Sequence, residues 1–449
     1  MMVPESKKSR HAGWPRMNLP LVIFVIAIVV RAVFLLAMLF FHEGSSPEVM
    51  FPDTTKYIDA ADFLFGRNET GEYQLLLVGP GYPVFLGLLM TIFGQSYSIV
   101  LMIQIVLSAA TAACLAAVAR LLYNNRLLAF LTGLIAALSL TSISLAAALL
   151  SDTLLLFLFV FSVYLCFRGI QEDRRTLLTV AGLLGGLSIL VRSVALFLPP
   201  LVIIFAFLAP ASWRSPSRRT FINSVLVAAI MILIPLVWAG RNVARHDIFT
   251  VAETGPGAAR LFLAGKVLHT ARERPPHEYR AFRDSLYAAT VPNIESGRYK
   301  KLHDETRAFI FSTIQKYPGL FLRTYLATVL GNATAISALH NIQLPHLANL
   351  FDRFDRNFNP GHKNPLILLL TLIGSVLLIR KNARPTLMLL GIIICFAAAS
   401  GVTFGQGSRI YFPAQTAWPI MVAASFIFFY DLGGLILRSL TILAKRPAR

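Results

Sequence analysis

The chain has 449 residues, of which 56% are hydrophobic and only 14% are charged. About a quarter of the residues in a typical soluble domain are charged, and one soluble core cannot enclose this much apolar surface. The composition therefore excludes a soluble enzyme, a disordered scaffold and a disulfide-linked secreted domain. The net charge is +19. In a membrane protein this excess indicates topology, because short cytoplasmic loops collect Lys and Arg, and no nucleic-acid partner is expected.

Apolar runs long enough to cross a hydrocarbon core recur along the chain. The first, 19–41, is too long for a signal-peptide core and lacks a small-residue cleavage pattern, so we interpret it as an anchor that follows a cytoplasmic N-terminus. The sequence predicts an all-α polytopic membrane protein with about ten transmembrane helices and a cytoplasmic C-terminus. The further spans are expected at 97–122, 127–147, 150–169, 177–193, 195–210, 220–240, 363–380, 385–403 and 411–430.

These spans divide the chain into modules. The joints between neighbouring spans on the cytoplasmic side are short and basic, which supports the assigned topology. The predicted modules are a cytoplasmic tail at 1–18, an N-terminal transmembrane module at 19–240 that includes an outer loop at 42–96, an extracytoplasmic segment with surface helices at 241–362, C-terminal transmembrane helices at 363–430, and a basic cytoplasmic tail at 431–449.

Short helices are predicted on the outer side of the membrane. Residues 54–65 have apolar positions at helical spacing, and the apolar stretch 82–93 is too short to span. We expect both to lie at the membrane surface as juxtamembrane helices. Residues 317–339 are ambiguous between a surface helix, a re-entrant segment and an eleventh span. Their polar content favours a surface helix.

Asp53 is the first candidate for chemistry. It follows Pro52 and precedes the predicted helix at the outer surface. One interpretation is a helix N-cap, in which the carboxylate accepts hydrogen bonds from free backbone N–H groups. The other is a general base held at the membrane interface. The two interpretations are compatible, because a capping bond would hold the carboxylate in place.

A second carboxylate and several arginines are expected at the same membrane face. A carboxylate next to hydrocarbon is costly unless it has a partner or a function, and N-capping of the fourth span is the alternative for it. Arginine suits a phosphate because its planar guanidinium donates two parallel hydrogen bonds, although contact with lipid headgroups is the alternative for each. With Asp53, the residues at this face are Asp152, Arg192, Arg241 and Arg409.

Arg31 lies within the first span. An intramembrane arginine is a functional candidate by default. It could also extend to the interface or form structural contacts with another helix, and we favour a structural role.

At these residues the chain resembles the GT-C superfamily of integral-membrane glycosyltransferases, in particular the branch of protein O-mannosyltransferases and bacterial aminoarabinose transferases of lipid A. The order and shared sidedness of the motifs carry the resemblance. They are Pro52-Asp53 with Tyr57, Gly79-Pro80-Gly81-Tyr82-Pro83 with Phe93-Gly94, Leu150-Ser151-Asp152-Thr153, Gly185-Gly186-Leu187 through Arg192, Trp238 to Asn242, and Arg409-Ile410-Tyr411 to Pro413.

The resemblance implies transfer of a sugar from a polyprenyl-phosphate donor to a hydroxyl of a glycan, lipid or protein acceptor. The reaction would take place on the extracytoplasmic side of the bilayer, in a bacterial inner membrane. Asp53 would be the general base and Asp152 the second catalytic acid. The donor phosphate or substrate would contact Arg192, Arg241, Lys266, Arg409, Tyr57, Tyr82 and Tyr411.

The sequence also departs from the family pattern. A basic residue often precedes the Pro-Pro pair in relatives, whereas Val78-Gly79 stand there in this chain. Phosphate binding would then fall to other residues. A divalent metal, Mg²⁺ or Mn²⁺, assists some relatives, and Asp53 and Asp152 would hold one if this chain uses it.

Two other classes remain as alternatives. A transporter or flippase of lipid-linked sugars should carry polar residues through the middle of several spans, whereas these segments are nearly all apolar. A non-catalytic assembly subunit would have no need for an acid at the position of Asp53.

Overall fold

The computed structural model describes residues 18–40, 53–208, 218–334, 365–403, 409 and 412–444. All regular secondary structure within these residues is helical, as the sequence predicts. The α-helices are α1 (Leu19–Phe40), α2 (Thr54–Leu64), α3 (Glu72–Val78), α4 (Gly81–Phe93), α5 (Tyr97–Tyr123), α6 (Arg126–Ala137), α7 (Leu140–Ala146), α8 (Asp152–Glu172), α9 (Arg175–Val191), α10 (Leu198–Leu208), α11 (Arg218–His246), α12 (Thr254–Ala258), α13 (Gly265–Ala271), α14 (Tyr279–Ala288), α15 (Val291–Glu295), α16 (Tyr299–Lys316), α17 (Pro318–Ala333), α19 (Pro365–Ser400) and α20 (Trp418–Ala444).

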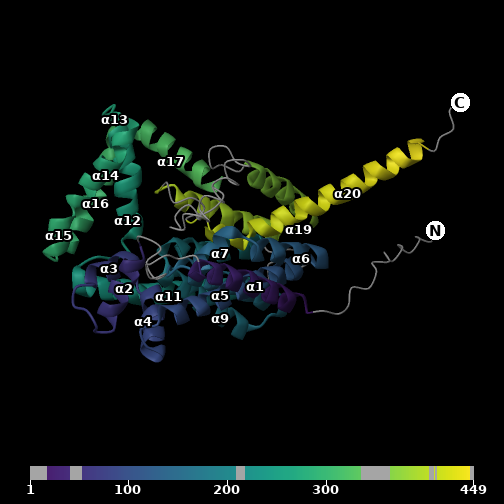
Figure 1. The fold of residues 1–449 in the computed structure, drawn as a ribbon, viewed down its shortest axis with the longest axis horizontal. Helices are drawn as coiled ribbons and strands as arrows, with labels where there is room; N and C mark the ends of the chain where they lie inside the picture. Colours follow the sequence, from purple (N-terminus) through teal and green to yellow (C-terminus); the bar gives the residue numbers. More distant parts are fainter. Residues whose placement is uncertain are drawn as a thin grey trace.

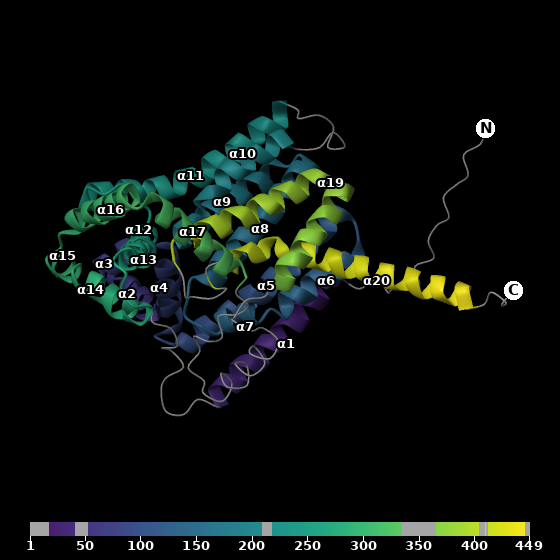
Figure 2. The same ribbon diagram turned by 90° about the horizontal axis from the view of Figure 1, so that it is seen from above.

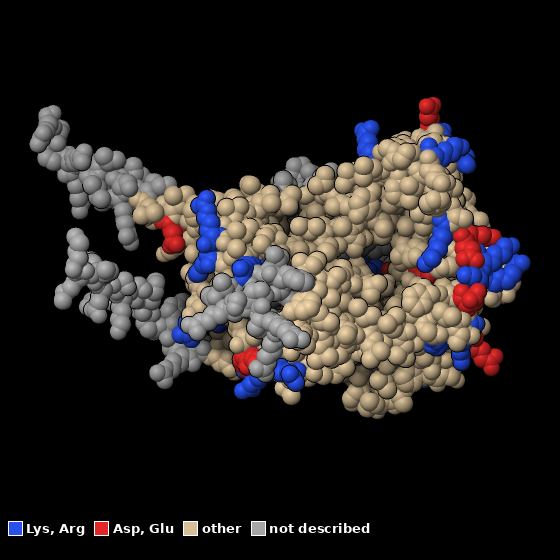
Figure 3. Space-filling model, turned by 180° about the vertical axis from the view of Figure 1, so that it is seen from behind, with Lys and Arg blue, Asp and Glu red and all other residues tan. Residues whose placement is uncertain are grey.

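The helices form an elongated apolar body with a helical cap at one end. The cap, α12 to α16, lies at the end opposite to the start of α1 and the end of α20, and α2 to α4 share its end of the molecule (Figures 1 and 2). In Figure 3, charged side chains gather at the two ends and leave a broad belt of other residues between them. Such a belt is expected where the protein surface faces hydrocarbon.

Among the described residues, fewer helices meet the length and composition of a membrane span than the ten that the sequence predicts. Within the described part of the chain, six helices are long and apolar enough to cross a membrane, and a seventh span results if the bent pair α6–α7 counts as one. Ten spans are therefore not confirmed. The six are Leu19–Ala37, Tyr97–Tyr123, Asp152–Glu172, Phe221–His246, Leu366–Ser400 and Trp418–Leu435.

Breaks and short helices account for the difference. The predicted spans 363–380 and 385–403 correspond to the two halves of α19, which are two helices that meet at a kink at Asn382, with Pro385 three residues further on. A proline inside a helix removes one backbone hydrogen bond and bends the chain. The predicted spans 177–193 and 195–210 correspond to α9 and to a short helix that begins with the 3₁₀ turn η1 (Ser193–Phe197). Each is shorter than the length that usually spans a bilayer.

The helices predicted at 54–65 and 82–93 are found as α2 and α4. The short helix α3 between them was not predicted. The ambiguous segment 317–339 contains α17, which is not among the candidate spans of the described residues. The last helix differs in position from the prediction, because a 3₁₀ turn, η6 (Phe412–Thr416), precedes α20, and α20 continues to Ala444.

Arg31 has a structural role in the apolar body. Its side chain is 1% exposed and donates hydrogen bonds to the carbonyls of Ala136 and Ala137, at 3.4 and 2.9 Å, and to the hydroxyls of Ser108 and Ser142, at 2.8 and 2.9 Å. The last carbonyls of a helix have no intrahelical partner, and α6 ends at Ala137 where the chain bends by 51° into α7. Arg31 thus stabilises the bend.

We expect Arg31→Met to destabilise the protein. The variant keeps an apolar side chain in α1 but leaves the carbonyls of Ala136 and Ala137 without these donors, and each unsatisfied buried group costs about 1–3 kcal/mol. The unfolding midpoint of the purified protein in detergent should fall. Val33→Met, at a position on the same helix that is 61% exposed, is the control. Equal midpoints for the two variants would contradict the structural role.

Candidate active site

Contacts between α2 and the joint before α8 bring the two predicted acids together. Thr54 Oγ1 donates to the carbonyl oxygen of Leu149 at 3.3 Å, and Tyr57 Oη lies 2.8 Å from Ser151 Oγ. These contacts hold the first turn of α2 beside the first turn of α8, where Asp152 is the first helical residue. Residues about one hundred positions apart in sequence therefore meet at the cap end of the helical body.

Asp53 occupies the N-cap position of α2, but its side chain makes no capping hydrogen bond. Instead, Lys56 Nζ lies 2.8 Å from Asp53 Oδ1, and Arg409 Nη1 lies 2.7 Å from Asp53 Oδ2. The side chain of Asp53 is 27% exposed, whereas that of Arg409 is 5% exposed. Of the two interpretations of Asp53, capping through the side chain is therefore not found.

Arg409 connects the two acids. Its Nε lies 3.2 Å from Asp152 Oδ2, while its Nη1 contacts Asp53. Asp152 is fully buried and also accepts from Arg192 through Oδ1. A buried carboxylate is tolerated when it is paired and hydrogen-bonded, and here two guanidinium groups perform this task. The result is a continuous chain of charges, Asp53, Arg409, Asp152 and Arg192.

The positive neighbours determine the ionisation of Asp53. Burial alone would raise the pKa of its carboxyl group, but the charges of Arg409 and Lys56 dominate and hold this pKa well below its usual range. Asp53 is therefore a carboxylate at neutral pH. A base with so low a pKa is weak while both cations remain bound to it.

The glycine-proline motif at 79–83 positions Arg192. Gly79 has a φ of +79°, which favours glycine. A Cβ on Gly81 would lie 2.4 Å from the backbone nitrogen of Val191 and 2.6 Å from the carbonyl carbon of Leu190. Glycine therefore lets the start of α4 touch the end of α9, immediately before Arg192 leaves the helix in an extended conformation.

A cavity of about 550 Å³ opens at this cluster. Asp53, Tyr57, Arg192 and Arg409 line it, whereas Asp152 lies behind the arginines and does not. Its volume is in the range of small-molecule sites, about 300–1,000 Å³. The space-filling view shows a hollow in this part of the surface with charged atoms visible inside it (Figure 3).

The other predicted site residues that the structure describes lie outside the cavity lining. Arg241 packs over the Trp238 ring at 4.8 Å and lies 3.8 Å from Glu72 Oε1. Lys266 lies over the ring of Tyr279, with 4.8 Å from Nζ to the centroid. Tyr82 is buried and donates to Gln104 Oε1 at 2.7 Å.

Tyr82 supports the site from behind, because its ring packs edge-on against that of Tyr57 with 4.9 Å between the centroids. Tyr411 lies outside the described residues.

Several lining residues were missed by sequence reasoning. Lys56 could have been found, because it stands three positions after Asp53 at the start of a helix, where side chains meet. Glu253, Arg260 and His303 also line the cavity. They come from a segment without a recognisable motif and are separated by many residues, so no local signal marks them.

The two acids do not offer a ready metal site. All four of their carboxylate oxygens accept from cationic side chains, Asp53 from Lys56 and Arg409, and Asp152 from Arg192 and Arg409. No group of three or more His, Cys, Asp or Glu residues with the arrangement of a metal site occurs among the described residues. A divalent cation at Asp53 and Asp152 would have to displace arginine, so these residues do not fit the Mg²⁺ or Mn²⁺ that the sequence left as an open possibility.

Comparisons with known proteins found one similar family and several similar structures. A family model described as dolichyl-phosphate-mannose-protein mannosyltransferase matches residues 78–238. The apo oligosaccharyltransferase of Archaeoglobus fulgidus is similar in structure, with a TM-score of 0.55 and 13% identity over 97% of this chain and 53% of that chain. The archaeal oligosaccharyltransferase AglB from the same organism, in complex with an inhibitory peptide and a dolichol-phosphate, has a TM-score of 0.51, 13% identity and the same coverage. No curated protein matches the sequence.

These matches confirm the resemblance to the GT-C superfamily, to which both the mannosyltransferase family and the archaeal enzyme belong. The chain spans about half the length of the solved relatives. At 13% identity the structural likeness establishes the fold. The chain is a multi-pass membrane protein with a GT-C-type fold, and its relatives are glycosyl and oligosaccharyl transferases.

Proposed function

We propose that this protein transfers a sugar from a polyprenyl-phosphate donor to an acceptor hydroxyl on the extracytoplasmic side of a membrane. The observation that carries the proposal is the cluster of Asp53, Lys56, Arg192 and Arg409 on one cavity. It combines one partly exposed carboxylate with three cations. Such a set can bind a phosphate and accept a proton at the same place.

The proposed reaction is an inverting displacement. The acceptor oxygen attacks the anomeric carbon and forms the new glycosidic bond, while the bond between this carbon and the phosphate oxygen breaks. The acceptor proton passes to Asp53, and the electron pair leaves with the polyprenyl phosphate. Arg409, Arg192 and Lys56 stabilise the negative charge that develops on the leaving phosphate. Preorganised donors of this kind are often the largest contribution to catalysis.

Donor binding would activate the base. In the structure, Arg409 and Lys56 bind Asp53 and lower its pKa. A donor phosphate competes for the same two cations. Their charge is then shared with the phosphate, so the pKa of Asp53 rises toward its ordinary range and the carboxylate becomes a stronger base when the donor is in place.

Asp152 acts on the reaction through the arginines. It is fully buried and does not line the cavity. We therefore propose that Asp152 holds Arg192 and Arg409 in position and does not contact the substrate.

The arrangement of the helices supports the proposed side of the membrane. The cluster lies at the end that carries α2 to α4 and α12 to α16, opposite to the start of α1 and the end of α20 (Figure 1). The segment before α1 is basic, which indicates the cytoplasmic side.

A transport function is less well supported. Arg31, the main charged residue within a predicted span, makes structural contacts at the bend between α6 and α7, so it does not indicate a path for substrate through the membrane.

The test is a transfer assay with purified full-length protein. We would incubate it with undecaprenyl-phosphate sugars, among them mannose, glucose, galactose and 4-aminoarabinose, and with an extract of cell-envelope glycans, lipids and proteins. We expect release of undecaprenyl phosphate together with labelling of one acceptor class. Movement of the intact donor across liposome membranes without any release would instead indicate a flippase.

A further inference from the structure

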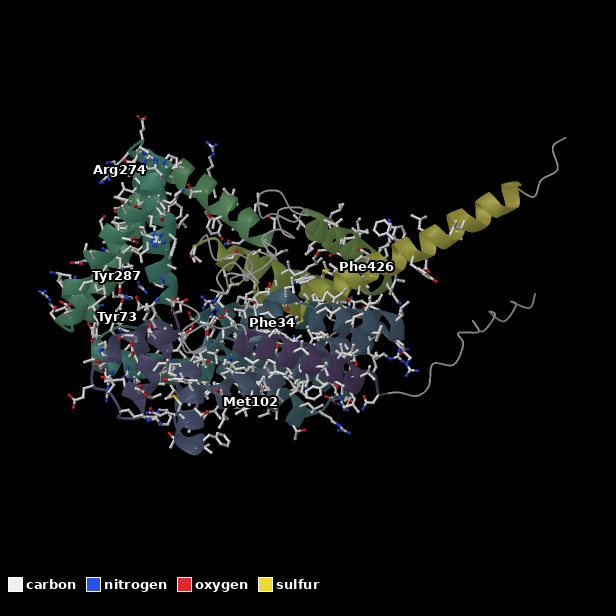
Figure 4. All side chains as sticks on the ribbon, viewed as in Figure 1. Phe34, Tyr73, Met102, Arg274, Tyr287 and Phe426 are labelled. Atoms are coloured by element: carbon white, nitrogen blue, oxygen red, sulfur yellow. The ribbon has the colours of Figure 1, made fainter. Side chains whose placement is uncertain are left out.

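A second polar cluster lies in the same cavity, at the helices of the cap. Glu253, Arg260, His303 and Thr306 line the cavity there, together with several tyrosines. Tyr73 on α3 and Tyr287 on α14 belong to this end of the molecule (Figure 4). The proposed reaction at Asp53, Lys56, Arg192 and Arg409 gives these residues no role.

Glu253 presents a carboxylate with one unused oxygen. Its Oε2 accepts from Nδ1 of His303 at 3.0 Å, and the side chains of Glu253 and His303 are 12% and 5% exposed. Its other oxygen, Oε1, is buried and has no hydrogen-bond partner among the described residues. A buried acceptor without a partner is costly. A ligand hydroxyl that donates to Oε1 would remove this cost.

The backbone holds Glu253 in place. Its N–H donates to the carbonyl oxygen of Leu76 at 3.1 Å, and Thr254 Oγ1 donates to the carbonyl oxygen of Leu77 at 2.5 Å. These bonds fasten the start of α12 to α3, the helix that leads into the turn at Gly79. The carboxylate is therefore connected to the same elements that position Arg192.

Arg260 supplies an unused donor. Its Nη1 donates to Thr306 Oγ1 at 3.1 Å, while its Nε is buried and has no hydrogen-bond partner among the described residues. It lies in a π-helical turn, η2 (Ala259–Ala264). Such turns insert an extra residue into a helix and occur often at functional sites.

Aromatic rings accompany these polar groups. The rings of Tyr73 and Tyr299 lie 5.8 Å apart between centroids, and both residues line the cavity. A hydroxyl group is both a donor and an acceptor. Glu253 and Arg260 both line the cavity. A ligand with neighbouring hydroxyls can thus donate to the Glu253 carboxylate and accept from the Arg260 guanidinium, while its apolar C–H groups contact the rings.

We propose that this cluster is a sugar-binding subsite, in which Glu253 and Arg260 hydrogen-bond to hydroxyls of a pyranose or furanose ring. The inference rests on the proposed function, since a phosphate at Arg409 and a sugar at Glu253 would occupy one cavity. The ring belongs either to the donor or to a carbohydrate acceptor, and both sources present the same chemistry to Glu253 and Arg260.

The test compares ligands that differ only in the sugar. Binding of undecaprenyl-phosphate sugars and of undecaprenyl phosphate would be measured on purified full-length protein, as wild type and as Glu253→Gln. If the donor sugar binds here, the variant should lose the extra affinity that the sugar provides, about 10–100-fold, because a hydrogen bond to a charged group is lost. Its affinity for undecaprenyl phosphate should not change.

A second arm detects an acceptor sugar. In the transfer assay, Glu253→Gln should then raise the half-saturating concentration of the acceptor extract by a similar factor at unchanged donor affinity. Arg260→Met is a second variant for both arms if Glu253→Gln does not fold. Asp284→Asn, an exposed carboxylate on α14 paired with Arg283, is the matched control.

The inference is overturned if Glu253→Gln and Arg260→Met change neither the sugar-dependent affinity nor the acceptor concentration. A wild-type protein that binds sugars through Glu253 but releases no undecaprenyl phosphate would instead contradict the proposed transfer and retain the subsite.

Discussion

Asp53→Asn should lower the turnover of sugar transfer by about 10²–10⁴-fold, the usual contribution of a positioned general base. The amide keeps the shape of the side chain but cannot take the acceptor proton. The affinity for the donor should stay the same or increase, because the amide no longer neutralises the charges of Arg409 and Lys56. The measurement is kcat and the donor KM of the purified variant.

This combination separates a base from a structural residue. A merely structural role would weaken donor binding and protein stability along with turnover. Asp59→Asn, on the same helix but outside the cavity lining, is the control and should retain wild-type kcat. Full activity of Asp53→Asn with normal folding would rule out Asp53 as the base.

Arg409→Lys should reduce transfer by about 10²–10³-fold, as found when one preorganised donor to a developing negative charge is lost. Arg409 reaches Asp53 with Nη1 and Asp152 with Nε. A lysine has a single ammonium group and cannot reproduce this planar arrangement. Because the positive charge is kept, the variant tests geometry. We expect the donor KM to rise and kcat to fall.

The alanine variant should behave differently. Arg409→Ala removes a cation that Asp152 contacts while fully buried, and breaking a buried ion pair costs about 3–5 kcal/mol. Its unfolding midpoint should fall well below that of Arg409→Lys. Arg245→Lys, at an exposed arginine paired with Glu72, serves as the control. Unchanged donor KM and kcat in Arg409→Lys would remove Arg409 from the proposed phosphate site.

The elements that the sequence predicts best are those with a long local pattern. The apolar runs of α1, α5 and α8 coincide closely with predicted spans, because burial in hydrocarbon requires an unbroken run of apolar residues. The bends within the predicted spans were not predicted. The break between α6 and α7 depends on Arg31 in α1, a contact across more than one hundred residues that no local pattern contains.

The residues of the candidate site also differ in how far the sequence predicts their positions. Asp53, Asp152, Arg192 and Arg409 could be selected as candidates that lie together, because charges at the ends of apolar runs are costly and therefore informative. Arg241 satisfied the same criterion, but it pairs with Glu72 away from the cavity. The sequence places a residue at a membrane face, but it does not determine which other residues at that face its side chain contacts.

The sequence by itself therefore determined the class of protein, the helical composition and the acids and arginines proposed for the site. The tertiary structure decided which of them share a cavity, that Asp53 binds Arg409 in place of capping α2, and that Glu253 and Arg260 face the same space. The physical reason is the distance along the sequence over which each interaction acts. Hydrophobicity and helix formation act over neighbouring residues, whereas ion pairs and cavities arise between segments that only packing brings together.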